Sequence, residues 1–175
     1  MKNKILTLYT ILAIFVIACY QSPAFAAGGT ARAGLAQAHE AAATWKPDAA
    51  LVQLITFAGN TDGTAEKWTY VFHSPKAKRG YQVAVSDGKI VQELEVSASF
   101  TDSLDSGFID SPVAIAEAKN KGLVTKGKSM MMLLVMLKNT KNQGGYWNIV
   151  GDMEEGISMI IDARTGKFFR QQKFE

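Results

Sequence analysis

The chain has 175 residues, of which 47% are hydrophobic and 20% are charged, a composition that predicts one folded domain and excludes a disordered or fibrous chain. Its 19 basic and 16 acidic side chains give a net charge of +3. The single cysteine excludes a disulfide framework and a thiolate metal cluster.

The segment from Met1 to Ala26 has the three-part layout of a secretory signal peptide. Lys2 and Lys4 precede an apolar run over residues 5–19, and Ala24-Phe25-Ala26 ends the segment. Small side chains at the two positions that a signal peptidase reads predict cleavage after Ala26. The run is shorter than the roughly twenty apolar residues that span a bilayer, so we expect no transmembrane span after cleavage.

The same apolar run leaves a second interpretation open. Residues 16–19, Val-Ile-Ala-Cys, resemble a bacterial lipobox, in which Cys19 would carry a lipid anchor. Signal peptidase cleavage after Ala26 is favoured over lipid attachment at Cys19, because Pro23 and the Ala-x-Ala sequence that follows it fit a signal peptidase site. Both interpretations predict an exported protein, either periplasmic or secreted.

The charge of the mature chain bears on its partners. Cleavage after Ala26 removes two of the 19 basic side chains and no acidic one, which leaves 17 against 16 and a net charge of +1. Such a chain lacks the basic surface that a nucleic acid backbone selects. We therefore expect no nucleic acid partner.

The first part of the mature chain predicts one helix followed by four strands. Residues 31–45 place Leu35, Ala38, Ala42 and Trp45 on one helical stripe, and Pro47 ends the helix. Turn sequences separate the strands, and the clearest is the two-residue hairpin signal Asp87-Gly88. The four strands are predicted from segments rich in β-branched and aromatic residues, which are 50–58, 67–73, 81–86 and 89–100.

Alternation within the fourth of these strands predicts which side chains face the core. Leu94 and Val96 are expected to face the core, whereas Glu93 and Glu95 are expected to face water. Outward acids of this kind usually serve solubility. We therefore do not interpret Glu93 and Glu95 as the paired carboxylates of a glycosidase.

The second part of the chain follows the same plan. Ser111-Pro112 predicts a helix start with a capping hydroxyl, and Gly122 closes the helix. Trp147 takes the place in this part that Trp68 holds in the first, a correspondence that suggests duplication. We therefore predict one α+β domain over residues 27–175, built of two tandem helix-plus-antiparallel-meander repeats at about 30–100 and 110–175, with the helices packed on one face of the sheet. Its later strands are predicted at 130–137, 146–150, 157–161 and 167–171.

These strand and turn motifs resemble the PepSY or PepSY-like family. The second half carries the Trp147 strand and the turn Asp162-Ala163-Arg164-Thr165-Gly166-Lys167, and the first half resembles a diverged copy with Asp87-Gly88-Lys89 at its turn. The resemblance implies small exported helix-on-sheet modules that bind or restrain partner proteins, peptidases among them. Paired modules are also similar in architecture to the secreted β-lactamase inhibitor proteins. The resemblance brings no catalytic residue.

The residues with catalytic or metal-binding chemistry do not form a known pattern. His39-Glu40 begins a zinc-protease motif, but Ala43 occupies the position of the second histidine. His73 is expected at the surface, and no nucleophile motif accompanies either histidine. We therefore expect no enzyme, no metal and no cofactor. A solvated connector without the ligand spacing of a calcium loop is predicted from Asp102, Asp105 and Asp110.

Residues 130–137 are all apolar, so both faces of a strand there need cover. A central strand covered on both sides, or a short helix, would explain the pattern without a function. The functional interpretation uses the side chains that alternate with Met130, Met132 and Leu134. It assigns a partner-binding surface to Met131, Leu133 and Val135.

Two functions stay open at this point. The leading one is a noncatalytic exported module that binds an envelope protein, or restrains or inhibits a peptidase, through its sheet. The alternative is a carrier or sensor of a small apolar ligand held between helix and sheet. A pocket lined by Trp45, Trp68 or Trp147 would favour the carrier, and a solid core with an exposed apolar sheet face would favour the protein-binding module.

Overall fold

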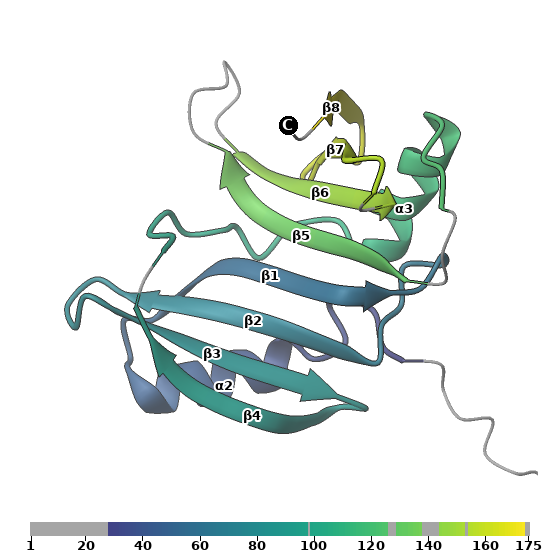
Figure 1. Ribbon diagram of the computed structural model, residues 1–175. Helices are drawn as coiled ribbons and strands as arrows, with labels where there is room; N and C mark the ends of the chain where they lie inside the picture. Colours follow the sequence, from purple (N-terminus) through teal and green to yellow (C-terminus); the bar gives the residue numbers. More distant parts are fainter. Residues whose placement is uncertain (1–27, 98, 126–128, 138–143, 153, 174–175) are drawn as a thin grey trace, which may run out of the picture.

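The computed structural model describes residues 28–97, 99–125, 129–137, 144–152 and 154–173. The predicted signal peptide, its cleavage site and Cys19 lie outside these residues. Eight strands form one antiparallel sheet in the order β4-β3-β2-β1-β5-β6-β7-β8, and two helices accompany it (Figure 1). No helix within the described ranges is long and apolar enough to cross a membrane.

The helices and strands lie close to the ranges that the sequence predicts. The segment over residues 130–137 is a strand, which excludes the helical interpretation. The helices are α2 (Leu35–Trp45) and α3 (Ser111–Asn120). The strands are β1 (Ala50–Gly59), β2 (Lys67–Ser74), β3 (Arg79–Ser86), β4 (Lys89–Val96), β5 (Met130–Leu137), β6 (Gly144–Asp152), β7 (Ile157–Asp162) and β8 (Phe168–Lys173).

The prediction of two tandem helix-plus-meander repeats is wrong, because all eight strands belong to one sheet. β1 and β5 pair antiparallel at its centre, with Leu54 opposite Leu134 and Ile55 opposite Leu133. Two separate meanders would each leave the backbone of their first strand unpaired on one edge. The β1–β5 ladder satisfies both of these edges and joins the strands into a continuous layer (Figure 1).

Both helices pack on the same face of the sheet and share one core with it. α2 packs against β2, β3 and β4, and α3 against β6 and β7. The helices contribute small side chains, which bring them close to the strands. The helical side chains buried in this core are Leu35, Ala38, Ala42, Ala114, Ile115 and Ala118, and β5 contributes Met130, Met132 and Leu134.

Two tryptophans lie at the centre of this core. The ring centroids of Trp68 and Trp147 are 6.2 Å apart in an edge-to-face arrangement. Trp68 Nε1 donates a hydrogen bond to the Gly29 carbonyl at 2.8 Å, and Trp147 Nε1 donates to the Ile109 carbonyl at 3.0 Å. Each indole is therefore buried and satisfied, as large aromatic groups with one polar atom require.

The start of α3 differs in one detail from the sequence prediction. Asp110, not Ser111, caps the helix, because its Oδ1 accepts a hydrogen bond from the Ser111 backbone N–H at 2.8 Å. The Ser111 hydroxyl instead accepts from the Ala31 N–H at 2.9 Å, and Asp110 Oδ1 also accepts from the Arg32 N–H at 3.1 Å. These contacts tie the segment before α2 to the start of α3.

Candidate functional site: the helix-free sheet face and the β4 edge

The predicted surface residues Met131, Leu133 and Val135 share the sheet face that carries no helix. They alternate with Met130, Met132 and Leu134, which belong to the core. Leu133 lies between Ile55 of β1 and Asn148 of β6 in the pairing register. The structure therefore brings the three predicted residues together on one face.

Their exposure differs along β5. Val135 is only 5% exposed, and residues 99–102 of the connector lie beside it around a cavity of about 310 Å³. Met131 and Leu133 are half-buried, as is Ile55. The most exposed apolar side chain on this face is Phe57, at 71%. We call the group Ile55, Phe57, Met131 and Leu133 the β1–β5 patch.

The sequence analysis did not identify Phe57 as a surface residue, although the alternation of side chains along β1 indicates it. Leu54 and Thr56 of β1 are buried on the helix side of the sheet. Strict alternation then sends Ile55 and Phe57 to the other face. A bulge after Thr56, where the register against β5 shifts, accompanies the high exposure of Phe57.

The acids of β4 face the side opposite to the one predicted. The register places Glu95 opposite Tyr81 and Glu93 opposite Val83, so both acids share the helix side of the sheet. Leu94, which was expected in the core, is 49% exposed on the other face. β4 is an edge strand whose side chains are exposed on both faces of the sheet. Because neither face is buried, the alternation of apolar residues does not identify a core face, and pairing with β3 sets the orientation of the strand.

On the helix side these acids meet an aromatic pair. The rings of Trp45 and Tyr81 stack with centroids 4.8 Å apart and an interplanar angle of 7°. Glu95 Oε2 accepts a hydrogen bond from Trp45 Nε1 at 3.1 Å, and Glu93 Oε1 accepts from the Tyr81 hydroxyl at 2.8 Å. Burial first, and then the bond to Glu93, raises the pKa of Tyr81 to about 12, so its hydroxyl remains a donor.

An open groove of about 690 Å³ lies beside this aromatic pair, between α2 and β4. α2 supplies one wall, and β3 and β4 supply the other. We call it the α2–β4 groove. Its lining residues are Gln37, Glu40, Ala41, Thr44 and Trp45 on the helix, and Tyr81, Lys89, Ile90 and Glu93 on the strands.

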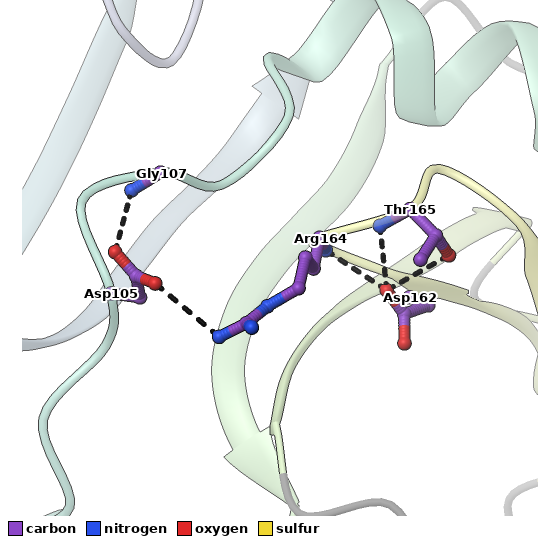
Figure 2. Close-up of polar contacts among 5 residues, drawn as sticks. All are labelled: Asp105, Gly107, Asp162, Arg164 and Thr165. Carbon is purple, nitrogen blue, oxygen red and sulfur yellow. Dashed lines mark hydrogen bonds and ion pairs between the residues drawn. The ribbon is translucent and has the colours of Figure 1, made fainter.

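The turn that carries the family resemblance has a structural role. Asp162 Oδ1 accepts hydrogen bonds from the N–H groups of Arg164 and Thr165 and from the Thr165 hydroxyl (Figure 2). Gly166 adopts a φ of 71°. Asp and Gly at these positions therefore shape the connection from β7 to β8.

Figure 2 also shows the Arg164 side chain extending toward Asp105 in the connector before α3. The Arg164 Nη2 to Asp105 Oδ2 distance is 3.4 Å, and both side chains are largely exposed. An exposed ion pair of this kind contributes little to stability. A cavity of about 420 Å³ lies beside the pair, with Tyr146 and Gly145 in its wall.

Neither histidine is fully exposed. His73 is buried at 9% exposure, so its predicted surface position is wrong. His39 is half-buried with its ring edge-on to Phe72 at 5.1 Å, and burial lowers the pKa of His39. Within the described residues, no group of three His, Cys, Asp or Glu side chains is placed to hold a metal.

Comparison with solved structures finds a protein of similar fold. The chain resembles the crystal structure of a protein from Clostridium difficile 630 that is described as a "putative lipoprotein", with a TM-score of 0.56. The alignment covers 81% of this chain and 93% of that chain at 12% sequence identity. No protein-family model matches the chain, and no curated protein matches it. At this identity, the likeness establishes a shared fold.

Proposed function

We propose that this chain is a noncatalytic exported protein that binds an envelope protein through the helix-free face of its sheet. The observation that carries the proposal is the β1–β5 patch, in which Phe57 is 71% exposed beside the half-buried Ile55, Met131 and Leu133. Restraint of a peptidase, which the PepSY resemblance implies, belongs to the same proposal.

The core supports binding at the surface in preference to binding inside. Trp68 and Trp147, which would line an internal ligand pocket, are 2% and 0% exposed and pack against each other. The patch, in contrast, has apolar side chains that are only partly covered. Burial of one large apolar side chain contributes about 1.5 to 3 kcal/mol, so a partner that covers Phe57 and Leu133 would gain useful affinity.

Replacing the most exposed member of the patch tests this docking surface. We expect Phe57→Lys to weaken partner capture about tenfold or more, because the burial of one aromatic ring is lost. The unfolding midpoint should stay near that of the parent, since the side chain already lies in water. The measurement is a pulldown from the native envelope, with the retained protein quantified by mass spectrometry.

The matched control is Val113→Lys. Val113 is 53% exposed and belongs to α3, which lies on the face of the sheet opposite to the β1–β5 patch. This variant should retain the partner as the parent does. Equal capture by Phe57→Lys and the parent would show that the patch is not the docking site. A histidine double variant, His39→Ala with His73→Ala, should retain function if it remains folded, and its selective loss of function would refute a noncatalytic role.

Export makes a prediction about the mature N-terminus. We expect the intact mass of the exported protein to correspond to a chain that begins at Ala27, because the Ala-x-Ala sequence ends at Ala26. A chain that begins at Cys19 and is heavier by a diacylglyceryl group would establish the lipid anchor instead. The description of the Clostridium difficile protein as a lipoprotein fits an envelope location under either outcome.

The alternative, a carrier of a small apolar ligand, has one observation in its favour. Trp45 lines the α2–β4 groove between helix and sheet. The groove is open, however, and Glu40, Lys89 and Glu93 contribute to its lining. Sites for small apolar ligands enclose most of the ligand surface and place few charges around it. The α2–β4 groove is better suited to an elongated polar ligand than to a small apolar one.

A further inference from the structure

We infer that the outer edge of β4 and the α2–β4 groove form a second binding site, which takes an extended, positively charged peptide segment as an added strand. β4 is the last strand of the sheet, whereas β1 and β5 are its central strands (Figure 1). The β1–β5 patch also lies on the face opposite to the groove. The second site does not depend on the docking surface proposed above.

The first observation is an open strand edge. β4 pairs with β3 from Ser86 opposite Lys89 to Gly80 opposite Val96, and it is the last strand in the sheet order. No described residue pairs with its other edge. Backbone N–H and C=O groups on such an edge are a template for another extended chain.

The second observation is the exposure of β4. Every side chain from Lys89 to Glu95 is exposed, including three apolar ones, Ile90 at 39%, Val91 at 56% and Leu94 at 49%. Edge strands that avoid pairing are usually short, or carry proline or an inward charge. β4 has eight residues and no proline, and the charges that it carries on the helix side, Glu93 and Glu95, favour a basic strand over an acidic one. An added strand would cover apolar area on both sides of the sheet.

The third observation is the wall beside the edge. Gln37, Ala41 and Trp45 follow one another at intervals of four residues, so they form one stripe of α2 that faces the groove, with Glu40 and Thr44 beside it. A strand added to β4 would point alternate side chains into the groove. Peptide sites built by strand addition gain affinity from backbone hydrogen bonds and specificity from such alternate side chains.

The charge of the groove selects the occupant. Glu40 and Glu93 line it, and Lys89 is the single basic residue in its lining. Arg79 is already paired with Glu95, at 3.0 Å from Arg79 Nε to Glu95 Oε1. Lysine and arginine have apolar stems that pack on aromatic rings and cationic ends that reach carboxylates. The groove therefore favours a peptide with basic side chains at alternate positions.

A peptide pair tests the charge preference. The probe is a fluorescein-labelled, amidated peptide of sequence Val-Lys-Val-Lys-Val-Lys-Val, and its counterpart has Glu in place of Lys. We expect saturable binding of the Lys peptide by fluorescence anisotropy and binding of the Glu peptide at least tenfold weaker. Equal binding of both peptides would overturn the charge assignment, and failure of the Lys peptide to bind would overturn the site.

Substitutions in the groove locate that binding. We expect the double variant Glu40→Gln with Glu93→Gln to bind the Lys peptide roughly three- to tenfold more weakly, as the loss of two partly exposed ion pairs predicts. Glu154→Gln removes an exposed acid in the turn before β7 and should leave the affinity unchanged. Equal effects of the double variant and the control would place the peptide elsewhere.

Backbone methylation distinguishes an added strand from binding by side chains alone. One edge of a strand presents the N–H groups of alternate residues to its neighbour. We expect N-methylation of one alternate set of amides in the Lys peptide to abolish binding and methylation of the other set to be tolerated. Equal binding of both methylated forms would overturn strand addition. So would self-association of the protein through β4 at the assay concentration, since a second copy would then occupy the edge.

Discussion

The variant Trp147→Ala is expected to lower the free energy of unfolding by about 3 to 5 kcal/mol, the range for deletion of a large buried aromatic side chain. Trp147 is fully buried, and its ring lies 6.2 Å from both Trp68 and Phe108. The change also leaves the Ile109 carbonyl without the indole donor that now lies 3.0 Å away. Urea unfolding, compared with the parent at a common slope, measures this loss.

Two matched variants separate the packing of Trp147 from its hydrogen bond. Trp147→Phe keeps an aromatic ring in the core but removes the donor, so its loss should be smaller than that of the alanine variant. Phe57→Ala removes an aromatic side chain that is 71% exposed, and it should change stability by about 0.5 kcal/mol or less. A Trp147→Ala protein as stable as Phe57→Ala would contradict the core described here.

The fragments 27–104 and 105–175 are expected not to fold when each is expressed alone. Each fragment is small and contains no cysteine. Chains shorter than about 80 residues that lack a disulfide rarely have a sufficient core of their own. Separation removes the whole β1–β5 ladder and the contact between Trp68 and Trp147. It also breaks the hydrogen bond from Ala31 N–H to the Ser111 hydroxyl.

Thermal melting followed by near-ultraviolet circular dichroism measures this dependence. Each fragment alone should show no cooperative transition, and an equimolar mixture should regain one if the strands find their partners. Sharp and independent melting of both fragments would mean that the two groups of strands are separate folding units. The single core around Trp68 and Trp147 would then contribute little to stability.

Local features of the fold follow directly from the sequence. Asp87 and Gly88 have φ values of 49° and 69°, the two positive angles that the predicted two-residue hairpin requires. The strand at residues 130–137 begins and ends where its apolar run does. Such features depend on neighbours within a few residues, and for that reason a single sequence is sufficient to predict them.

The order of the strands in the sheet could not be predicted from the sequence, because it depends on pairing between segments that are far apart in the chain. Nothing near β1 indicates that its free edge pairs with β5, which comes much later in the chain and places Leu134 opposite Leu54. The face of β4 was also misassigned. Its alternation is regular, but alternation identifies a core face only where one side of a strand is buried, and β4 is exposed on both sides.

The candidate sites also contain some residues that a local pattern predicts and others that depend on distant contacts. Met131, Leu133 and Val135 were predicted together because their strand alternates regularly, and the structure places them on one face. The connector that covers Val135 was not predictable, since residues 99–102 approach it from far along the chain. The α2–β4 groove was missed because Trp45 and Glu95 are 50 residues apart, and their contact depends on how α2 lies over the edge of the sheet.

The central β1–β5 ladder also sets the order in which the chain can be completed as it leaves the ribosome. β1 to β4 pair with one another in chain order, whereas the second edge of β1 stays open until β5 has been made. At a synthesis rate of about 5 to 20 residues per second, the stretch from Leu54 to Leu134 keeps this edge open for roughly 4 to 16 seconds. An open edge of this length is a site of intermolecular strand pairing. β1, whose second edge later makes the finished sheet continuous, is therefore exposed to intermolecular pairing while the chain is incomplete.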